Sequence, residues 1–264
     1  MKKFILPMAL LLLALAGCGR EPAPSNHFER YDGLIDPAKP IAYGEDHEVH
    51  LFAAGANLPA VKPPLEASLA RGVTIVVEEQ YFSVNFQEAA ALNDFKPYKN
   101  LVYCGTVAGR DPVSLHITKT LAPELVKAAQ ASGAELFVIN NHYSRDQLIL
   151  YLLAKDPAAL AKLAADRSEQ IFGYLLDRYR QRLARAAYQN AVIEDKFFAD
   201  RPFSIKIPNI YRLWKDDKAG RFLSFIFQPA KPTRDKADKY ISVYHEPMAA
   251  NQVTPEWVYK TRQE

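Results

Sequence analysis

The densest group of side chains able to do chemistry occupies residues 140–146, between two apolar runs. In it, His142 is suited to proton transfer, Arg145 to holding an anion, and Asp146 to orienting either one. Loops carried by rigid strands concentrate binding groups. We therefore predict a ligand site formed by His142, Tyr143, Arg145 and Asp146. The alternative is a plain connection between strands, whose asparagine and serine side chains satisfy the turn.

A second group is a series of arginines in the segment 158–198, which has no proline and one glycine, Gly173. Its composition predicts one long helix, or two consecutive helices with a bend near the glycine. Arginines without an acidic residue four positions before them would form a basic stripe that contacts anionic headgroups or an acidic partner. The alternatives are a solvated face or salt bridges between domains. The stripe consists of Arg167, Arg178, Arg182 and Arg185.

The first eighteen residues have the layout of a secretory signal. Lys2 and Lys3 are followed by an apolar run over residues 4–16, which is shorter than the ~18–20 residues that cross a bilayer as a helix. Small residues then precede Cys18. The sequence Leu-Ala-Gly-Cys at 15–18 is similar to the lipobox of bacterial lipoproteins. That resemblance implies cleavage before Cys18 and lipidation of this cysteine.

An acylated Cys18 would hold the protein at a membrane without a spanning helix, because several acyl chains together give stable anchoring. We therefore expect residues 1–17 to be a signal peptide, 18–45 a tether rich in proline, and 46–264 a body outside the cytoplasm. Gly19 stands where some lipoproteins retained at the inner membrane have aspartate, which favours the outer membrane.

Composition excludes several classes of protein. The formal charge of +3 falls to +1 once Lys2 and Lys3 are removed, so no general attraction to nucleic acid is expected. A hydrophobic content of 49% argues against disorder. With Cys18 lipidated, Cys104 is the remaining cysteine of two, and its apolar surroundings predict a buried, inert thiol.

The sequence contains no common catalytic or cofactor motif: no P-loop, dinucleotide fingerprint, HExxH, CxxC or GxSxG. His47 and His50 lie three apart at the start of a predicted strand, where they would face opposite sides, so we interpret them as two solvated histidines. Glu78 and Glu79 would diverge for the same reason. We predict no catalytic residue, cofactor or metal ligand.

The elements that position these groups indicate an α+β fold. Over residues 48–140 the predicted order is strand, helix, strand, strand, helix, strand, which matches a ferredoxin-like βαββαβ arrangement. The strands are expected at 48–53, 73–77 with a continuation at 81–86, 100–107 and 135–139, and the helices at 63–70 and 124–131.

After this first half we expect a buried strand at 148–154, the long helix or helix pair, and antiparallel strands toward the C-terminus. The strands 203–207 and 221–227 are predicted to pair as a hairpin, followed by a strand at 240–244 and a helix that begins near Pro255. The body would be one domain or two halves, 46–143 and 144–264.

The chain also resembles a family of uncharacterised lipoproteins of Bacteroidetes-type bacteria, known only as a domain of unknown function. The segments that carry the resemblance follow the lipobox and lie at 39–44, 98–102, 146–150 and 205–211. The resemblance implies a lipoprotein of the cell envelope, and it brings no catalytic residues.

Together these features predict a lipid-anchored envelope protein that binds or scaffolds a partner or ligand. The membrane, through acyl chains on Cys18, and an envelope protein are the expected partners. The alternative is a hydrolase-like enzyme facing the periplasm that uses His142, Arg145 and Asp146.

Overall fold

The computed structural model describes residues 36–74, 78–189, 193, 195–229 and 238–263. The chain forms two compact units that divide after Arg182, inside helix α7 (Ser168–Tyr188). A division after residue 143 is not found, because residues 141–147 join two paired strands of one sheet. The predicted signal peptide, Cys18 and most of the predicted tether lie outside the described residues.

The first unit is built on one five-stranded sheet with helices around it. Its elements are β1 (Glu48–Phe52), α3 (Asn57–Leu69), β4 (Ser83–Gln87), the 3-10 helix η1 (Ala89–Asn93), β5 (Asn100–Thr106), α4 (Pro112–Thr120), α5 (Pro123–Ser132), β6 (Ala134–Asn140), β7 (Leu148–Ala154), α6 (Pro157–Asp166) and most of α7. Strands β2 (Gly72–Thr74) and β3 (Glu78–Gln80) form a separate small hairpin, and residues 75–77 of the predicted strand lie outside the described part.

The strand order is β4-β1-β5-β7-β6, in which the first four strands are parallel and β6 is antiparallel to β7. All residues of β5 and β7 are buried, as expected for parallel strands covered on both faces. The fold is therefore mixed α and β. The ferredoxin-like order is not confirmed, because β1 lies between two parallel neighbours and an additional helix, α4, follows β5.

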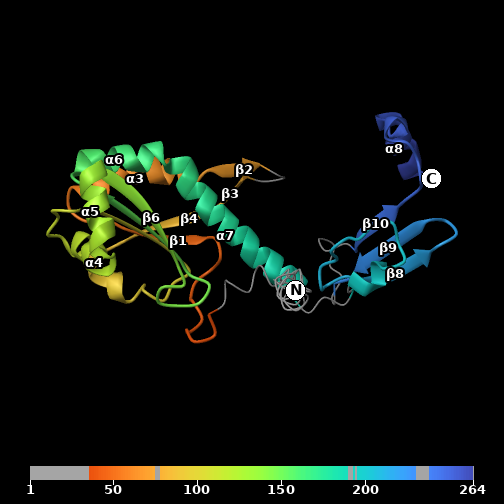
Figure 1. Cartoon of the computed structure of the whole chain (residues 1–264), viewed down its shortest axis with the longest axis horizontal. Coiled ribbons are helices and arrows are strands. Elements are labelled where there is room, and N and C mark those ends of the chain that lie inside the picture. Colours follow the sequence, from red (N-terminus) through yellow and green to blue (C-terminus); the bar gives the residue numbers. More distant parts are fainter. Residues whose placement is uncertain (1–35, 75–77, 190–192, 194, 230–237, 264) are drawn as a thin grey trace, which may run out of the picture. The chain divides into compact units, whose positions relative to one another are not determined.

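Helices cover both faces of this sheet (Figure 1). On one face, α3, α6 and α7 bury a core that includes Leu65, Leu150 and Leu175. On the other face, α4 and α5 cover a second core with Ile117, Tyr103 and Tyr151. The sheet therefore forms the middle of three layers, and its strand ends are the edges where polar groups gather.

The long helical segment contains a break, but not at the glycine. Helix α6 ends at Asp166, with Arg167 as its C-cap, and α7 begins at Ser168. Gly173 lies inside α7, and an added Cβ there would meet no atom within 4 Å. Of the two predicted alternatives, one long helix or two consecutive helices, the structure has the pair, and the break at Arg167 lies six residues before Gly173.

The second unit contains the antiparallel sheet β10-β9-β8. Its elements are η2 (Asp195–Phe198), β8 (Arg212–Asp217), β9 (Phe222–Phe227), β10 (Lys239–Tyr244), η3 (Ala250–Gln252) and α8 (Pro255–Gln263). The predicted hairpin partner of β9 was wrong: β8 pairs with it, because it directly precedes the turn, and residues 203–207 are not a strand. Ile207 nevertheless packs in the core of this sheet, beside Phe198 and Phe225.

Candidate functional site

The predicted ligand cluster lies in the connection between β6 and β7, residues 141–147, which we call the β6–β7 connection. Asn141 and Asp146 have positive φ angles of 54° and 63°, a conformation that Asn and Asp tolerate better than most residues. The Asn141 backbone N–H donates to the Gln147 carbonyl at 2.9 Å, and the Gln147 N–H donates to the Asn141 side chain at 3.1 Å. These bonds close the base of the connection.

The side chain of Gln147 is fully buried and holds the connection to the neighbouring loop. Its carbonyl oxygen accepts from the Tyr143 backbone N–H at 2.9 Å. Its amide group donates to the backbone carbonyls of Lys96 and Tyr98, at 2.6 and 2.7 Å. Because every polar atom of this buried amide is bonded, the connection has a defined conformation.

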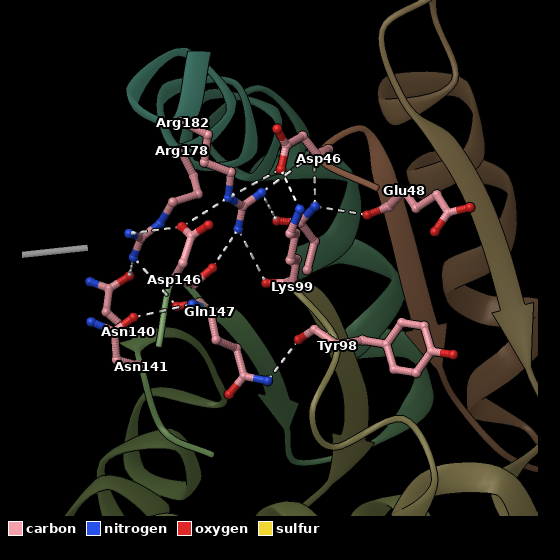
Figure 2. A network of polar contacts seen from close by, with 11 residues as sticks. Asp46, Glu48, Tyr98, Lys99, Asn140, Asn141, Asp146, Gln147, Arg178 and Arg182 are labelled. Carbon is pink, nitrogen blue, oxygen red and sulfur yellow. Dashed lines mark hydrogen bonds and ion pairs between the residues drawn. The ribbon is translucent and has the colours of Figure 1, made fainter. Parts of the chain in front are cut away.

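On its inner side, the β6–β7 connection meets two arginines of α7 (Figure 2). The Asp146 carboxylate accepts from Arg182 Nε at 3.0 Å, and the Asp146 carbonyl accepts from Arg182 Nη2 at 2.8 Å. Arg178 lies 4.0 Å from the same carboxylate and donates to the side chain of Asn140. The aspartate proposed for the ligand site therefore points toward α7 and is occupied there.

Arg182 also reaches the starts of two other strands. Its Nη1 donates to the Asn100 side chain at 2.9 Å, and its Nε lies 3.8 Å from Asp46. Asp46 in turn accepts from Lys99 Nζ at 2.8 Å. Asn100 donates to the backbone carbonyls of Asp46 and Glu48 at 3.0 and 2.8 Å. One guanidinium thus joins the amino-terminal ends of β1, β5 and β7.

Arg178 and Arg182 are only 6% and 5% exposed. Burial, together with the charge of Arg182, lowers the pKa of Arg178 to about 10, and Asp146 opposes this shift. Removing one member of such a buried charged group leaves the other uncompensated, which is strongly destabilising. These two arginines were predicted to lie on a basic surface stripe. In the structure they belong to a buried polar network, so they cannot contact lipid headgroups.

The other two members of the predicted stripe lie elsewhere. Arg167 is exposed and donates to Gln170 at 3.0 Å. Arg185 is half-buried and belongs to the second unit. The four arginines therefore do not share one solvent-facing surface.

The outer side of the β6–β7 connection carries His142 and Tyr143. Their rings meet edge to face, with centroids 4.3 Å apart. The Tyr143 hydroxyl lies 3.5 Å from Nε2 of His116, which comes from α4. The ammonium of Lys96 lies 5.6 Å from the centroid of the Tyr143 ring. Two histidines and a lysine therefore gather around the Tyr143 ring, and we call His116, His142, Tyr143 and Lys96 the outer cluster.

Positive charge dominates the electrostatics of the outer cluster. Burial, Lys96 and His142 lower the pKa of His116 to about 4. Burial, Lys39 and Lys96 lower the pKa of His142. Both imidazoles are accordingly neutral at pH 7. A negative group placed among them would raise their pKa values, against the effect of the lysines.

Two tyrosines of the sheet lie beneath the outer cluster. Tyr103 and Tyr151 stack with ring centroids 5.3 Å apart, and Tyr103 lies 4.9 Å from the His116 ring. Burial raises the pKa of both hydroxyls, so they keep their protons. The floor of the cluster is therefore aromatic and uncharged.

The end of the predicted tether packs against this region. Lys39 Nζ donates to the Asn141 carbonyl, and the Arg145 backbone N–H donates to the Pro40 carbonyl at 2.9 Å. Ile41 forms a parallel bridge with Arg145. Residues 39–41 are thus part of the folded unit and bring a further cation beside His142 and Arg145.

Two further expectations concern histidine and cysteine. His50 is buried and not solvated: its Nδ1 lies 3.0 Å from the Gln87 amide, and burial lowers its pKa. The error arose because β1 is covered on both faces, so opposite orientations are both interior. His47 is exposed, and Glu78 and Glu79 are exposed in β3. Cys104 is buried, as predicted, and burial raises the pKa of its thiol.

Sequence reasoning missed the partners that complete both sides of the connection. They are Asp46, Lys99 and Asn100 on the inner side and Lys39, Lys96 and His116 on the outer side. One signal was present for the arginines: Arg178 and Arg182 continue the helical spacing of the buried Ile171 and Leu175. The other residues come from distant segments whose proximity no local pattern indicates.

Among the described residues, no group of three or more His, Cys, Asp or Glu side chains has an arrangement that would hold a metal ion. In the same part of the chain, no helix combines the length and apolar character needed to span a bilayer. Comparison with known proteins found no matching family model, no matching curated protein and no matching solved structure.

Proposed function

We propose that this protein is a lipid-anchored component of the cell envelope that binds an anionic group of a ligand or partner at the outer cluster. The observation that carries the proposal is geometric: Lys39 donates to the carbonyl of Asn141, next to His142, and Lys96 lies 5.6 Å from the Tyr143 ring that His142 contacts. Arg145 adds a fixed positive charge to the same loop.

The small number of carboxylates near these cations supports this assignment. Asp36 lies 3.7 Å from Lys39. Asp146, the acidic residue of the connection itself, is bonded to Arg182 on the inner side. Within the described residues, Lys96 and Arg145 form no ion pair with a carboxylate. An incoming carboxylate or phosphate would meet donors that are already gathered, which lowers the cost of binding.

The internal network gives this site its rigidity. Arg182 and Gln147 hold the β6–β7 connection from the inner side, so His142 and Tyr143 project from a fixed backbone. A binding site whose supporting residues are themselves bonded loses less entropy when it takes a ligand. The buried arginines therefore act as positioning residues for the outer cluster.

The anchor is supported by the sequence alone. Lys2 and Lys3, the apolar run and Leu-Ala-Gly before Cys18 agree with a lipoprotein signal. Substitution Cys18→Ser is expected to release the protein from membranes into the soluble envelope fraction, because the acyl chains are lost. Retention of the substituted protein in washed membranes would contradict the anchor. The likeness to an uncharacterised lipoprotein family stays a prediction.

The anion site is tested by titrating the histidine signals of the soluble Cys18→Ser protein by NMR, with and without inorganic phosphate. Bound phosphate is expected to raise the pKa of His142 by about half a unit or more. Lys96→Met removes a donor and should weaken this effect. The matched control is Lys162→Met, an exposed lysine of α6 that pairs with Asp166.

An unchanged pKa of His142 in phosphate, or an equal response in both lysine variants, would overturn the site. Vesicles containing phosphatidylglycerol form a second arm, which separates a lipid headgroup from a soluble anion as the source of the charge. A response to vesicles and none to free phosphate would assign the cluster to headgroup contact.

A hydrolase-like activity is the second candidate, and one observation favours it: His116 and Tyr143 are in contact beside His142. Since Asp146 is bound by Arg182, this pair and not His142 with Asp146 would supply acid–base chemistry. Hydrolysis of p-nitrophenyl esters should then fall in His116→Ala and in Tyr143→Phe. Equal turnover by both variants and the unsubstituted protein would exclude this use of the cluster.

A further inference from the structure

The second unit carries a groove that neither the anchor nor the outer cluster explains. It has a volume of about 960 Å³ and lies where α8 meets the sheet of this unit. Phe222 and Tyr244 contribute to it from β9 and β10, and Trp257 contributes from α8. These three aromatic side chains line the same groove and all belong to the second unit.

One face of the sheet is exposed along β10 beside this groove, whereas Ser224 and Ile226 of β9 on the same face are buried. Leu223, Phe225, Ile241 and Val243 point to the core of the unit. The alternate residues of β10 point the other way, and Tyr240 and Tyr244 on that side are 53% and 42% exposed. Exposed aromatic groups at this density favour a contact surface over a fully solvated one.

The charge of the groove is unbalanced. Lys215, Lys260 and Arg262 line it, whereas Glu246 is the acidic residue of the lining and accepts from the Tyr244 hydroxyl at 3.0 Å. Asp217 lies outside the lining, 3.6 Å from Lys215. From residue 183 onward the sequence has 14 Lys and Arg against 10 Asp and Glu, so the whole unit is basic. Positive charge among aromatic groups favours acidic and aromatic partners.

The edge of the sheet suggests how a partner would lie. Strand β10 is the end of the order β10-β9-β8, and among the described residues it pairs with β9 alone. Ser242 and Tyr244 of this edge strand line the groove. An extended peptide beside β10 would gain main-chain hydrogen bonds while its side chains enter the groove.

We propose that this groove binds an extended acidic segment of a partner protein, with its aromatic or apolar side chains packed on Phe222, Tyr244 and Trp257 and its carboxylates near Lys215, Lys260 and Arg262. The inference goes beyond the anion site, because it concerns a different unit and a macromolecular partner.

The test is fluorescence anisotropy with the soluble Cys18→Ser protein and a short fluorescein-labelled peptide in which glutamate alternates with phenylalanine. Binding is expected, and it should weaken as salt screens the charges. Arg262→Glu should weaken it about tenfold or more, through repulsion of the glutamates. Lys239→Glu is the matched control, because this exposed lysine of β10 does not line the groove.

The aromatic contribution has its own pair of variants. Trp257→Ala should weaken binding, whereas Tyr259→Ala, which removes an exposed ring of the same helix outside the lining, should leave it unchanged. A thermal unfolding midpoint equal to that of the unsubstituted protein shows that the fold of each variant is intact.

Three results would overturn the proposal. The first is equally strong binding of a peptide that alternates lysine with phenylalanine. The second is equal binding by the Arg262→Glu and Lys239→Glu variants. The third is that no peptide binds. Binding of a heparin fragment with the same dependence on Arg262, without peptide binding, would assign the groove to an anionic glycan instead.

Discussion

In the first unit, Arg178 and Arg182 are buried among the ends of strands, whereas in the second unit Lys215 and Arg262 line an open groove. The buried pair is satisfied by Asp46, Asp146 and several backbone carbonyls, and it joins parts of one fold. The pair in the groove is exposed, and Lys215 lies 3.6 Å from Asp217. Cations of the same formal charge thus hold strand ends together in one unit and are exposed in the other, where we propose that they contact a partner.

The hydrophobic cores of the two units also differ, in size and in how they are covered. The first unit buries complete strands, β5 and β7, between two helical layers. The second has a small core on one face of three strands, centred on Phe225 and Phe198. Both tryptophans, Trp214 and Trp257, lie in the second unit. Tryptophan fluorescence therefore reports on the second unit, and far-ultraviolet circular dichroism is dominated by the helices of the first.

The largest expected effect is that of Phe225→Ala, which removes a fully buried ring from the small core. It should destabilise the second unit by about 3–5 kcal/mol, as large-to-small core substitutions do. In urea, the fluorescence transition should move to lower concentration while the main dichroism transition stays in place. Coincident shifts of both signals would show that the two units unfold as one.

Arg182→Met should have the next largest effect, and on the other unit. It leaves Asp146 and Asp46 without their shared partner. The expected loss of stability is about 2–4 kcal/mol. This is less than for a fully buried ion pair, because both carboxylates are partly exposed. The dichroism transition should shift and the fluorescence transition should not. Arg167→Met, at an exposed position, is the control and should change stability by about 0.5 kcal/mol or less.

A smaller effect is the pH dependence of stability that His116 of the outer cluster contributes. The pKa of His116 is lowered to about 4 in the folded state, so the unfolded chain takes up a proton first as pH falls. The contribution of the neutral imidazole is present above about pH 6.5 and is lost progressively as pH falls from there toward 4. Between pH 7 and 5 the loss should be about 1–2 kcal/mol, after a discount for partial exposure.

The measurement is urea unfolding at both pH values, in the original protein and in His116→Gln. The difference between pH 7 and pH 5 should be smaller in the variant, since glutamine does not titrate. An unchanged difference would mean that other groups govern the acid response of this unit.

Helix starts illustrate how far local sequence reaches. Asp156 followed by Pro157 predicts the start of α6, and the Asp156 side chain does accept from the Ala159 N–H at 2.7 Å. The same pair at Asp111 and Pro112 begins α4, with Asp111 bonded to the Val113 N–H at 3.1 Å. This second signal was missed: the predicted order has no helix between the strand at 100–107 and the helix at 124–131. The helix was predictable from the sequence.

The candidate site was predictable only in part. The polar segment 140–146 was identified, and the structure brings His142 and Tyr143 together within it. The direction of Asp146 was not predictable, because it depends on α7 packing across the ends of β1, β5 and β7. Equally, β8 and not residues 203–207 pairs with β9, since the direct turn between them needs the shortest loop closure.

What the sequence by itself determined is local: the apolar runs that became β5, β6 and β7, the capping residues and the burial of Cys104. Only the tertiary structure decided that four strands run parallel, that two arginines are internal, and that Lys96 and His116 lie beside Tyr143. The reason is that periodicity and capping act over a few residues, whereas the burial of a charge depends on partners that the fold brings from segments far apart in the chain.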